Sequence, residues 1–231
     1  MSSDVIAIIP ARGGSSRIPR KNAKDFNGRP MIGWPIATCT VVDQISHTVV
    51  STDDDELARI ALDAGATSVI DRPAELATDT AGTAPVIQHA IDELGVDSDT
   101  LVMCIYPTAA LTPALVEEAL DLARHHPDTF VITVGRHRSP HERSLQRGAD
   151  DLMSLASKDH LLTRTQDLPQ RYFDAGKLYV ARAGIWKARE TMMEAPFVPF
   201  YLPDWAAVDI DEPDDWAVAE ALHRVFVVES S

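Results

Sequence analysis

The chain has 231 residues, of which 45% are hydrophobic and 6% aromatic, and its formal net charge is −14. This composition suits one α/β domain with an aliphatic core and argues against nucleic acid as a partner, which usually requires a basic face. The first ten residues lack the basic region of a signal peptide, and no apolar run approaches the ~20 residues of a membrane span. Cys39 and Cys104 lie in apolar contexts without metal-ligand spacing, which predicts reduced core residues of a cytoplasmic protein.

Strand and helix patterns alternate in chain order. Short apolar runs predict strands at 5–11, 47–53, 67–70, 99–108 and 129–137. Apolar residues at helical spacing predict intervening helices at 30–42, 54–66, 83–94 and 113–126. Asp53 or Asp54 is the expected N-cap of the second helix, and Gly65 is its expected C′ residue.

The alternation stops at residue 137. The stretch 137–175 is polar, charged and weakly periodic, which we interpret as an active-site flap or a dimerisation arm. Beyond it, the patterns predict strands at 176–182, 197–202 and 206–211 and helices at 183–193 and 211–226. Together the elements predict a single domain, 1–231, built on a doubly wound, mostly parallel α/β sheet. Ligands of such sheets bind beyond the carboxyl ends of the strands.

The loop after the first strand, IPARGGSSRIPRKN (9–22), is basic in an acidic chain. Gly13 and Gly14 are expected to adopt positive φ and to turn free amides toward an anion. Cations and hydroxyl groups surround them, from Arg12, Arg20, Lys21, Ser15 and Ser16. The loop lacks the spacing of a Walker A motif and of a dinucleotide fingerprint. We interpret it as a polyphosphate cradle, and a solvated basic turn is the alternative.

A second candidate site lies near the carboxyl terminus, where Asp209 and Asp211 flank Ile210. On an extended segment the two carboxylates share one face. With phosphate oxygens they would form a hard oxygen site suited to Mg²⁺. The same residues could instead begin a helix, with Asp211 as N-cap and Pro213 in the first turn. The residues alone leave both readings open.

Several segments in order carry a resemblance to a known family, namely IPARGGSSRIPRKN with GRPMIGWPI, VVSTDDDELARIALDAGA, RPAELATDTAGTAPVIQHAI and VDIDEPDDW. Together they resemble the cytidylyltransferases that activate nine-carbon ulosonic acids, the sialic acid-type CMP-sugar synthetases. The segment RTQDLPQRYFDAGKLYV is similar to the branch that acts on pseudaminic acid. The resemblance implies a Rossmann-like sheet of the nucleotide-diphospho-sugar transferase type.

The resemblance also implies an activity and a set of residues. Such enzymes join CTP to the anomeric hydroxyl of an acidic sugar, here pseudaminic acid, and release pyrophosphate; the CMP-sugar serves surface glycan or flagellin glycosylation. The implied catalytic residues are Lys21, Arg12 and Asp211, and the implied ligands of a Mg²⁺ cofactor are Asp209 and Asp211. The implied nucleotide contacts are Ala11, Arg12, Gly13, Gly14, Ser15, Lys21, Asn22, Arg72 and Thr83. The implied sugar contacts, in an arm that reaches the second subunit of a homodimer, are Arg164, Gln166, Arg171 and Asp174.

Two positions depart from the family pattern. Ser16 stands where a lysine is usual, and Lys177 replaces a usual glutamine near the sugar site. Three alternatives stay open: N-acetylneuraminate or legionaminate as the sugar, another base or a keto-deoxy-octulosonate acceptor, and a degenerate homologue that binds nucleotide without turnover. The missing dinucleotide fingerprint disfavours an oxidoreductase. No histidine spacing indicates a zinc site.

Overall fold

The structure is a computed structural model that describes residues 4–228 except 16, 79 and 195. Its centre is a seven-stranded sheet with the order β11-β7-β10-β6-β1-β4-β5. The strands are β1 (Val5–Pro10), β4 (Ile45–Thr52), β5 (Ser68–Asp71), β6 (Leu101–Ile105), β7 (Phe130–Arg136), β10 (Tyr172–Arg182) and β11 (Phe197–Tyr201). Strand β10 runs antiparallel to both of its neighbours, and the other pairs are parallel. The predicted mostly parallel sheet is confirmed.

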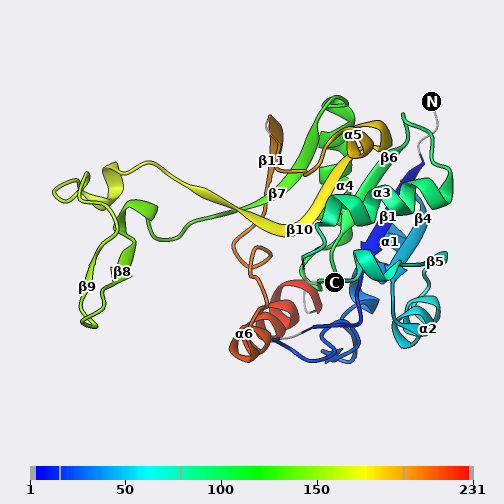
Figure 1. Cartoon of the computed structure of the whole chain (residues 1–231), viewed down its shortest axis with the longest axis horizontal. Coiled ribbons are helices and arrows are strands. Elements are labelled where there is room, and N and C mark those ends of the chain that lie inside the picture. The colour runs from blue at the N-terminus through cyan, green and yellow to red at the C-terminus, as the bar shows by residue number, and fades with distance from the viewer. Residues whose placement is uncertain (1–3, 16, 79, 195, 229–231) are drawn as a thin grey trace.

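Helices cover both faces of this sheet (Figure 1). They are α1 (Gly33–Val41), α2 (Asp55–Asp63), α3 (Thr83–Leu94), α4 (Pro113–His125), α5 (Ala183–Ala188) and α6 (Pro213–His223). One core cluster holds Ile36, Leu57 and Val116, from α1, α2 and α4. A second cluster holds Ile87 and Trp186, from α3 and α5. Alternate residues of the same strands enter the two clusters, because neighbouring side chains of a strand point to opposite faces. The predicted doubly wound arrangement is thereby confirmed.

Local signals set the ends of the early elements. Asp54 is the N-cap of α2, where its carboxylate accepts the Leu57 amide at 2.9 Å. Gly65 follows the helix with a φ of 101°, as expected of a C′ residue. The helix predicted at 30–42 begins only at Gly33. Pro30 instead ends a hairpin of β2 (Asp25–Phe26) and β3 (Arg29–Pro30), which forms because the intervening Asn-Gly pair turns with positive φ at both residues.

Several predictions for the last third of the chain are corrected. The strand predicted at 176–182 begins earlier, at Tyr172, because it pairs with β7 as far as the base of the arm. Residues 206–211 form no strand, since they run past the sheet toward α6. The N-cap of α6 is Glu212 rather than Asp211, because Glu212 and Asp215 form a capping box. Helix α5 ends at Ala188, and α6 continues into a π-helical turn, η4 (Arg224–Val228).

The stretch predicted as irregular projects from the sheet as a long arm (Figure 1). It contains a hairpin of β8 (Leu145–Arg147) and β9 (Met153–Leu155), which the sequence did not predict. Short 3-10 turns lie at η2 (His141–Arg143) and η3 (Thr165–Asp167), and η1 (Ala74–Leu76) follows β5. A role of the arm in dimerisation stays a prediction. Within the described ranges, no helix has the length and apolar character needed to cross a membrane.

Candidate active site

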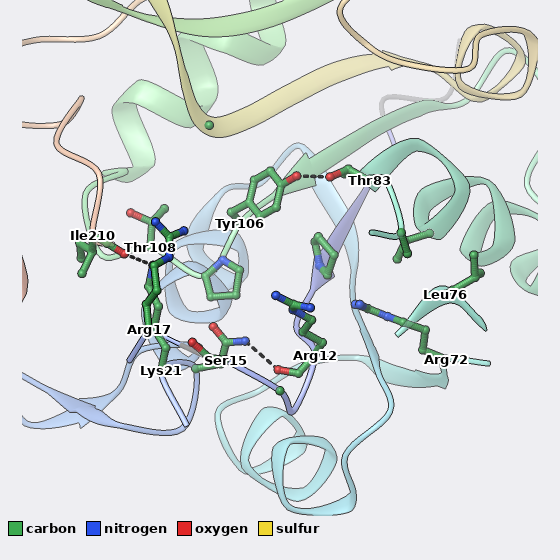
Figure 2. A pocket seen from close by; sticks show the side chains of 18 of the residues that line it. Arg12, Ser15, Arg17, Lys21, Arg72, Leu76, Thr83, Tyr106, Thr108 and Ile210 are labelled. Atoms are coloured by element: carbon green, nitrogen blue, oxygen red, sulfur yellow. Dashed lines mark hydrogen bonds between the residues drawn. The ribbon is translucent and has the colours of Figure 1, made fainter. Parts of the chain in front are cut away.

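A cleft of about 410 Å³ opens at the carboxyl ends of β1, β5 and β6 (Figure 2). Its walls come from the loop after β1, from residues 72, 76, 78 and 81–83, from residues 106–108, from the bend at 176–177 and from residues 209–210. This is the edge at which the sequence analysis placed the ligand. The predicted nucleotide-binding residues that line the cleft are Arg12, Gly14, Ser15, Lys21, Asn22, Arg72 and Thr83.

The cleft is strongly basic. The cations that line it are Arg12, Arg17, Lys21, Arg72 and Lys177. Among its described lining residues, Asp209 is the one carboxylate. In a chain with a formal net charge of −14, this local excess of positive charge attracts an anion into the cleft. A polyphosphate carries the negative charge that complements this cleft.

Close packing, rather than an unusual φ, explains a glycine at position 13 of the basic loop. Neither Gly13 nor Gly14 has a positive φ, so that prediction was wrong. A Cβ at Gly13 would lie 2.6 Å from the Asp54 carboxylate, so a side chain does not fit there. The Gly13 amide donates to Asp53 at 3.0 Å, and the buried Ala11 amide donates to a carbonyl of β4 at 2.9 Å. Ala11 and Gly13 therefore shape the loop and do not line the cleft.

Lys21 joins the basic loop to the late aspartate segment (Figure 2). Its ammonium donates to the carbonyl of Ile210, which lies 189 positions away in the chain. Beside it, Arg17 pairs with Asp211 at 2.7 Å. Burial lowers the pKa of Lys21, and the nearby Asp209 opposes this effect. The fold thus brings together the two candidate sites that the sequence analysis identified separately.

Arg20, in contrast, does not line the cleft. Its guanidinium pairs with Asp54 at 2.5 Å and also with Glu56, at the amino-terminal end of α2. The hydrogen bond from Arg20 is the main reason that the pKa of Asp54 is lowered. The expectation that Arg20 adds charge to the cradle is therefore wrong, because acidic residues of α2 hold its side chain. The third loop cation that lines the cleft, beside Arg12 and Lys21, is Arg17 rather than Arg20.

Arg72 and Thr83 lie on the side of the cleft away from Ile210 (Figure 2). Arg72 is buried, and its guanidinium donates to the Ser51 hydroxyl at 3.2 Å and to the Ser51 carbonyl at 2.5 Å. Burial lowers the pKa of this guanidinium. The Thr83 hydroxyl is hydrogen-bonded to the Tyr106 phenol, whose pKa is raised by burial. Both residues therefore present polar groups that the protein holds in place.

Lys177 enters the cleft from β10. Its side chain is 5% exposed, and its ammonium lies 3.4 Å from Oδ1 of Asp209. Burial lowers the pKa of the Lys177 ammonium, and Asp209 opposes this effect. For Asp209, burial acts to raise the pKa, but the neighbouring cations, Lys177 first among them, bring it below its usual range. Lys177, one of the two departures from the family pattern, is thus part of the cleft wall.

The four predicted sugar-binding residues do not line this cleft. Arg164 and Gln166 lie in the arm, at η3. Arg171 pairs with Glu142 of the arm at 3.1 Å. Asp174 lies on β10, close to the bend that enters the cleft. Their contact with a sugar stays a prediction.

The segment at Asp209 and Asp211 has the oxygen donors that a magnesium site needs. Ile210 is buried between the two aspartates, whose carboxylates are partly or largely exposed. Among the described residues, no group of three or more His, Cys, Asp or Glu side chains is arranged to hold a metal ion. Any ion here would need further ligands from phosphate oxygens and water, which is the coordination that Mg²⁺ prefers. The residues present therefore fit such an ion.

Sequence reasoning found Arg72 and Thr83, at the two ends of the segment that follows β5, but missed cleft residues between them. Thr78, Ala81 and Gly82 of this segment line the cleft. Its position beyond the carboxyl end of a parallel strand was a signal that could have found it. Ser16, where the sequence departs from the family pattern, lies outside the described residues.

The fold and the cleft together define a nucleotide-binding α/β protein, with the ligand site at the carboxyl edge of the sheet. The sequence model of the cytidylyltransferase family matches residues 6–200, and the chain belongs to this family. The predicted class of enzyme, a nucleotidyltransferase, is confirmed.

Relatives with assigned activities span the chain. The chain is 31% identical to a pseudaminic acid cytidylyltransferase of Campylobacter jejuni, with 95% of the chain and 96% of the relative covered. It is 32% identical to N-acylneuraminate cytidylyltransferase B of Danio rerio, with 93% of the chain and 50% of the relative covered. It is 29% identical to the CMP-N,N'-diacetyllegionaminic acid synthase of Legionella pneumophila, with 94% of the chain and 95% of the relative covered. The resemblance on which the sequence analysis relied is confirmed.

Solved structures support the fold. A CMP:2-keto-3-deoxy-manno-octonic acid synthetase complexed with CTP superimposes with a TM-score of 0.68 at 18% identity, covering 98% of the chain and 99% of that structure. The 4-diphosphocytidyl-2C-methyl-D-erythritol synthase of Anaerococcus prevotii gives 0.63 at 13% identity, with 94% of each chain covered. At these identities the likeness concerns the fold alone, which is the predicted nucleotide-diphospho-sugar transferase type.

Proposed function

We propose that the protein transfers CMP from CTP to pseudaminic acid, giving CMP-pseudaminate and pyrophosphate for surface glycan or flagellin glycosylation. The observation that carries the proposal is the basic cleft, in which Arg12, Arg17 and Lys21 converge beyond β1. The identity of 31% to the pseudaminic acid cytidylyltransferase of Campylobacter jejuni supports the choice of sugar.

In the proposed reaction, the anomeric oxygen of the sugar bonds to the α-phosphorus of CTP while the bond from that phosphorus to the pyrophosphate oxygen breaks. Pyrophosphate leaves with the electron pair, and the hydroxyl proton passes to solvent. Negative charge develops on the leaving group, so cations fixed beside it lower the barrier. We assign Arg12 and Lys21 to the triphosphate. We assign Lys21 to the leaving pyrophosphate, because the Ile210 carbonyl holds its ammonium next to the aspartate segment.

We assign a Mg²⁺ cofactor to Asp209 and Asp211. The Ile210 amide at 2.9 Å and Lys177 at 3.4 Å both contact Oδ1 of Asp209. Arg17 likewise contacts Oδ1 of Asp211 at 2.7 Å. Among the described residues these contacts involve Oδ1 alone, which leaves Oδ2 of each carboxylate for an ion. When bound, Mg²⁺ neutralises phosphate charge and lowers the pKa of the attacking hydroxyl.

We assign the cytosine and ribose to the side of the cleft formed by Arg72 and Thr83. Bonds to Ser51 hold Arg72, and a bond to Tyr106 holds Thr83. Groups that are already ordered lose little conformational entropy when a ligand binds. We assign the phosphates to Gly14 and Ser15 of the loop. Asn22 supports the loop, because its amide donates to a loop carbonyl at 3.1 Å.

We propose that the enzyme is a homodimer whose arms bring Arg164 and Gln166 to the partner's cleft. The projecting arm carries apolar side chains with large exposed fractions, 69% for Leu152 and 95% for Leu162. Burial of these side chains against a partner subunit would remove apolar surface from water. Light scattering should give twice the monomer mass, and Leu162→Asp should shift the protein toward the monomer. A wild-type monomer at assay concentrations contradicts this part of the proposal.

Two buried thiols support a cytoplasmic location. Cys39 and Cys104 are free, and burial raises the pKa of Cys39 to about 12. Unpaired cysteines are usual where the cellular environment keeps thiols reduced. Cell fractionation tests this location, and recovery of the enzyme with periplasmic markers contradicts it.

The acceptor is tested by pyrophosphate release from CTP with purified pseudaminic, N-acetylneuraminic, legionaminic and keto-deoxy-octulosonic acids. We expect the highest kcat/KM with pseudaminic acid. A preference for legionaminic acid would instead favour the alternative that the Legionella relative supports at 29% identity. CTP binding without pyrophosphate from any acceptor would identify a degenerate homologue. ATP, GTP and UTP serve as controls, and an equal rate with any of them contradicts the assignment of the base.

A further inference from the structure

The pairing of β10 with β7 is interrupted where β10 passes the cleft. Asp174 pairs with Val134 of β7, and the next pair joins Tyr179 to Ile132. The β10 residues 175–178 therefore lie opposite Thr133 alone. Gly176, inside this bulge, has a φ of 60°. Bulges beside active sites commonly redirect a side chain, and the side chain that this one directs into the cleft is Lys177.

Buried side chains hold the bulge in place. The Thr133 hydroxyl accepts from the amides of Lys177 at 3.2 Å and Leu178 at 3.0 Å, and donates to the Leu178 carbonyl at 3.1 Å. At the other end, the Asp174 carboxylate accepts the Gly176 amide at 3.0 Å. The amides of Gly176, Lys177 and Leu178 thus each have a side-chain partner at a fixed position. The orientation of Lys177 is consequently set by the fold.

The Lys177 ammonium has more donors than the protein engages. Its side chain is 5% exposed, and its partner among the described residues is Asp209, at 3.4 Å. An ammonium has three donors, and a buried charge is costly unless it is paired and hydrogen-bonded. One contact at this distance leaves most of that need unmet. An anionic ligand in the cleft would meet it.

The position of the Lys177–Asp209 pair indicates which anionic group would bind the Lys177 ammonium. Asp209 lines the basic cleft and also a second cavity of about 580 Å³ on the side of Arg136 and Arg138. Asp209 therefore lies at the boundary between the two spaces, and Lys177 lies beside it on the side of the basic cleft. With the triphosphate in the basic cleft, as proposed above, the second cavity is the neighbouring space from which an acceptor can approach. In a ulosonic acid, the carboxylate is attached to the same carbon as the attacking anomeric hydroxyl, so it arrives at the boundary together with the nucleophile.

We propose that Lys177 binds the carboxylate of the acidic sugar and thereby positions the anomeric hydroxyl for attack. The inference rests on the proposed function and assigns a specificity-determining residue within it. Loop cations hold the triphosphate, whereas Lys177 distinguishes an acidic acceptor from a neutral one. The sugar carboxylate forms charge-assisted hydrogen bonds with the ammonium, which are stronger and more directional than bonds between neutral groups.

A double-mutant cycle between protein and ligand tests this role. The enzyme and Lys177→Gln are each assayed for kcat/KM with pseudaminic acid and with its C1 carboxamide. We expect the wild type to prefer the acid by about 30- to 100-fold and the variant by less than about threefold, since the bond to the charged group is lost. The KM for CTP should change by less than about twofold, because uniform binding of the nucleotide is untouched. Lys187→Gln is the matched control, since Lys187 pairs with Asp92 at 2.5 Å outside the cleft.

The outcomes separate this inference from the proposed function. An active wild type whose preference for the acid is unchanged in Lys177→Gln overturns the inference and leaves the proposed function standing. An increase in the KM for CTP with no change in preference also overturns it, because Lys177 would then contact the nucleotide. If none of the acidic sugars supports pyrophosphate release by the wild type, both the inference and the proposed function are overturned. A melting temperature near that of the wild type shows that Lys177→Gln is folded, and preserved selectivity in Lys187→Gln excludes a general effect of lost charge.

Discussion

Replacing Lys21 with methionine tests the assignment of the cation at the leaving group. Methionine keeps an unbranched apolar stem and removes the ammonium that contacts the Ile210 carbonyl. Removal of one preorganised donor to charge that develops in the transition state lowers kcat by about 100- to 1,000-fold. Because the Ile210 carbonyl also loses its partner, the free energy of unfolding falls by about 1–3 kcal/mol. The expected fall in kcat is thus much larger than the fall in activity that partial unfolding of the variant would cause at the assay temperature.

The assay is continuous detection of pyrophosphate at saturating CTP and sugar, with a thermal melt of each variant. Arg20→Met is the matched control, since it removes the same charge from the same loop while its partners, Asp54 and Glu56, lie outside the cleft. We expect Arg20→Met to keep kcat within about threefold, because exposed ion pairs contribute about 0–1 kcal/mol. A folded Lys21→Met enzyme with a kcat near that of the wild type refutes the reasoning, as does an equal loss in Arg20→Met.

Three further predictions concern the metal, the loop and pH. Asp211→Asn should raise the Mg²⁺ concentration for half-maximal rate by about tenfold in a Mg²⁺ titration, and an unchanged requirement contradicts the metal assignment. Gly13→Ala places a Cβ 2.6 Å from Asp54 and should lower the free energy of unfolding in urea by about 1–3 kcal/mol. Gly14→Ala meets nothing within 4 Å and should change it by less than about 0.5 kcal/mol, so equal losses would refute the steric argument. Burial lowers the pKa of His223 from 6.5 to about 4, so between these values the unfolded chain binds a proton that the native chain does not. Stability should therefore fall by up to about 3 kcal/mol as the pH drops through this window, and His223→Gln should lose less in urea titrations; identical pH dependence contradicts this prediction.

The parts of the fold that local sequence determines were predictable. The strand at β1 reads as a continuous apolar run because both of its faces are buried. The N-cap at Asp54 was visible because capping depends on a few neighbouring residues. The position of the basic loop beyond a buried strand placed the ligand site at the carboxyl edge of the sheet, because that rule follows from the alternation of elements alone.

The remaining features depend on contacts between distant segments. The direction of β10 and its bulge at Gly176 follow from pairing with β6 and β7, for which the sequence of β10 carries no signal. The orientation of Arg20 depends on acidic residues of α2, more than thirty positions away. Asp209 and Asp211 had two readings in the sequence. The capping box at Glu212 removes Asp211 as the N-cap, because it assigns the helix start to a residue beyond the pair, and the metal assignment stays a proposal.

A crystal structure of the protein with CTP and Mg²⁺ tests the central claim most directly. The account predicts density for the triphosphate between Arg12 and Lys21, density for an ion at Asp209 or Asp211, and the cytidine next to Arg72. A nucleotide bound away from this cleft, with the cleft unoccupied, contradicts the account.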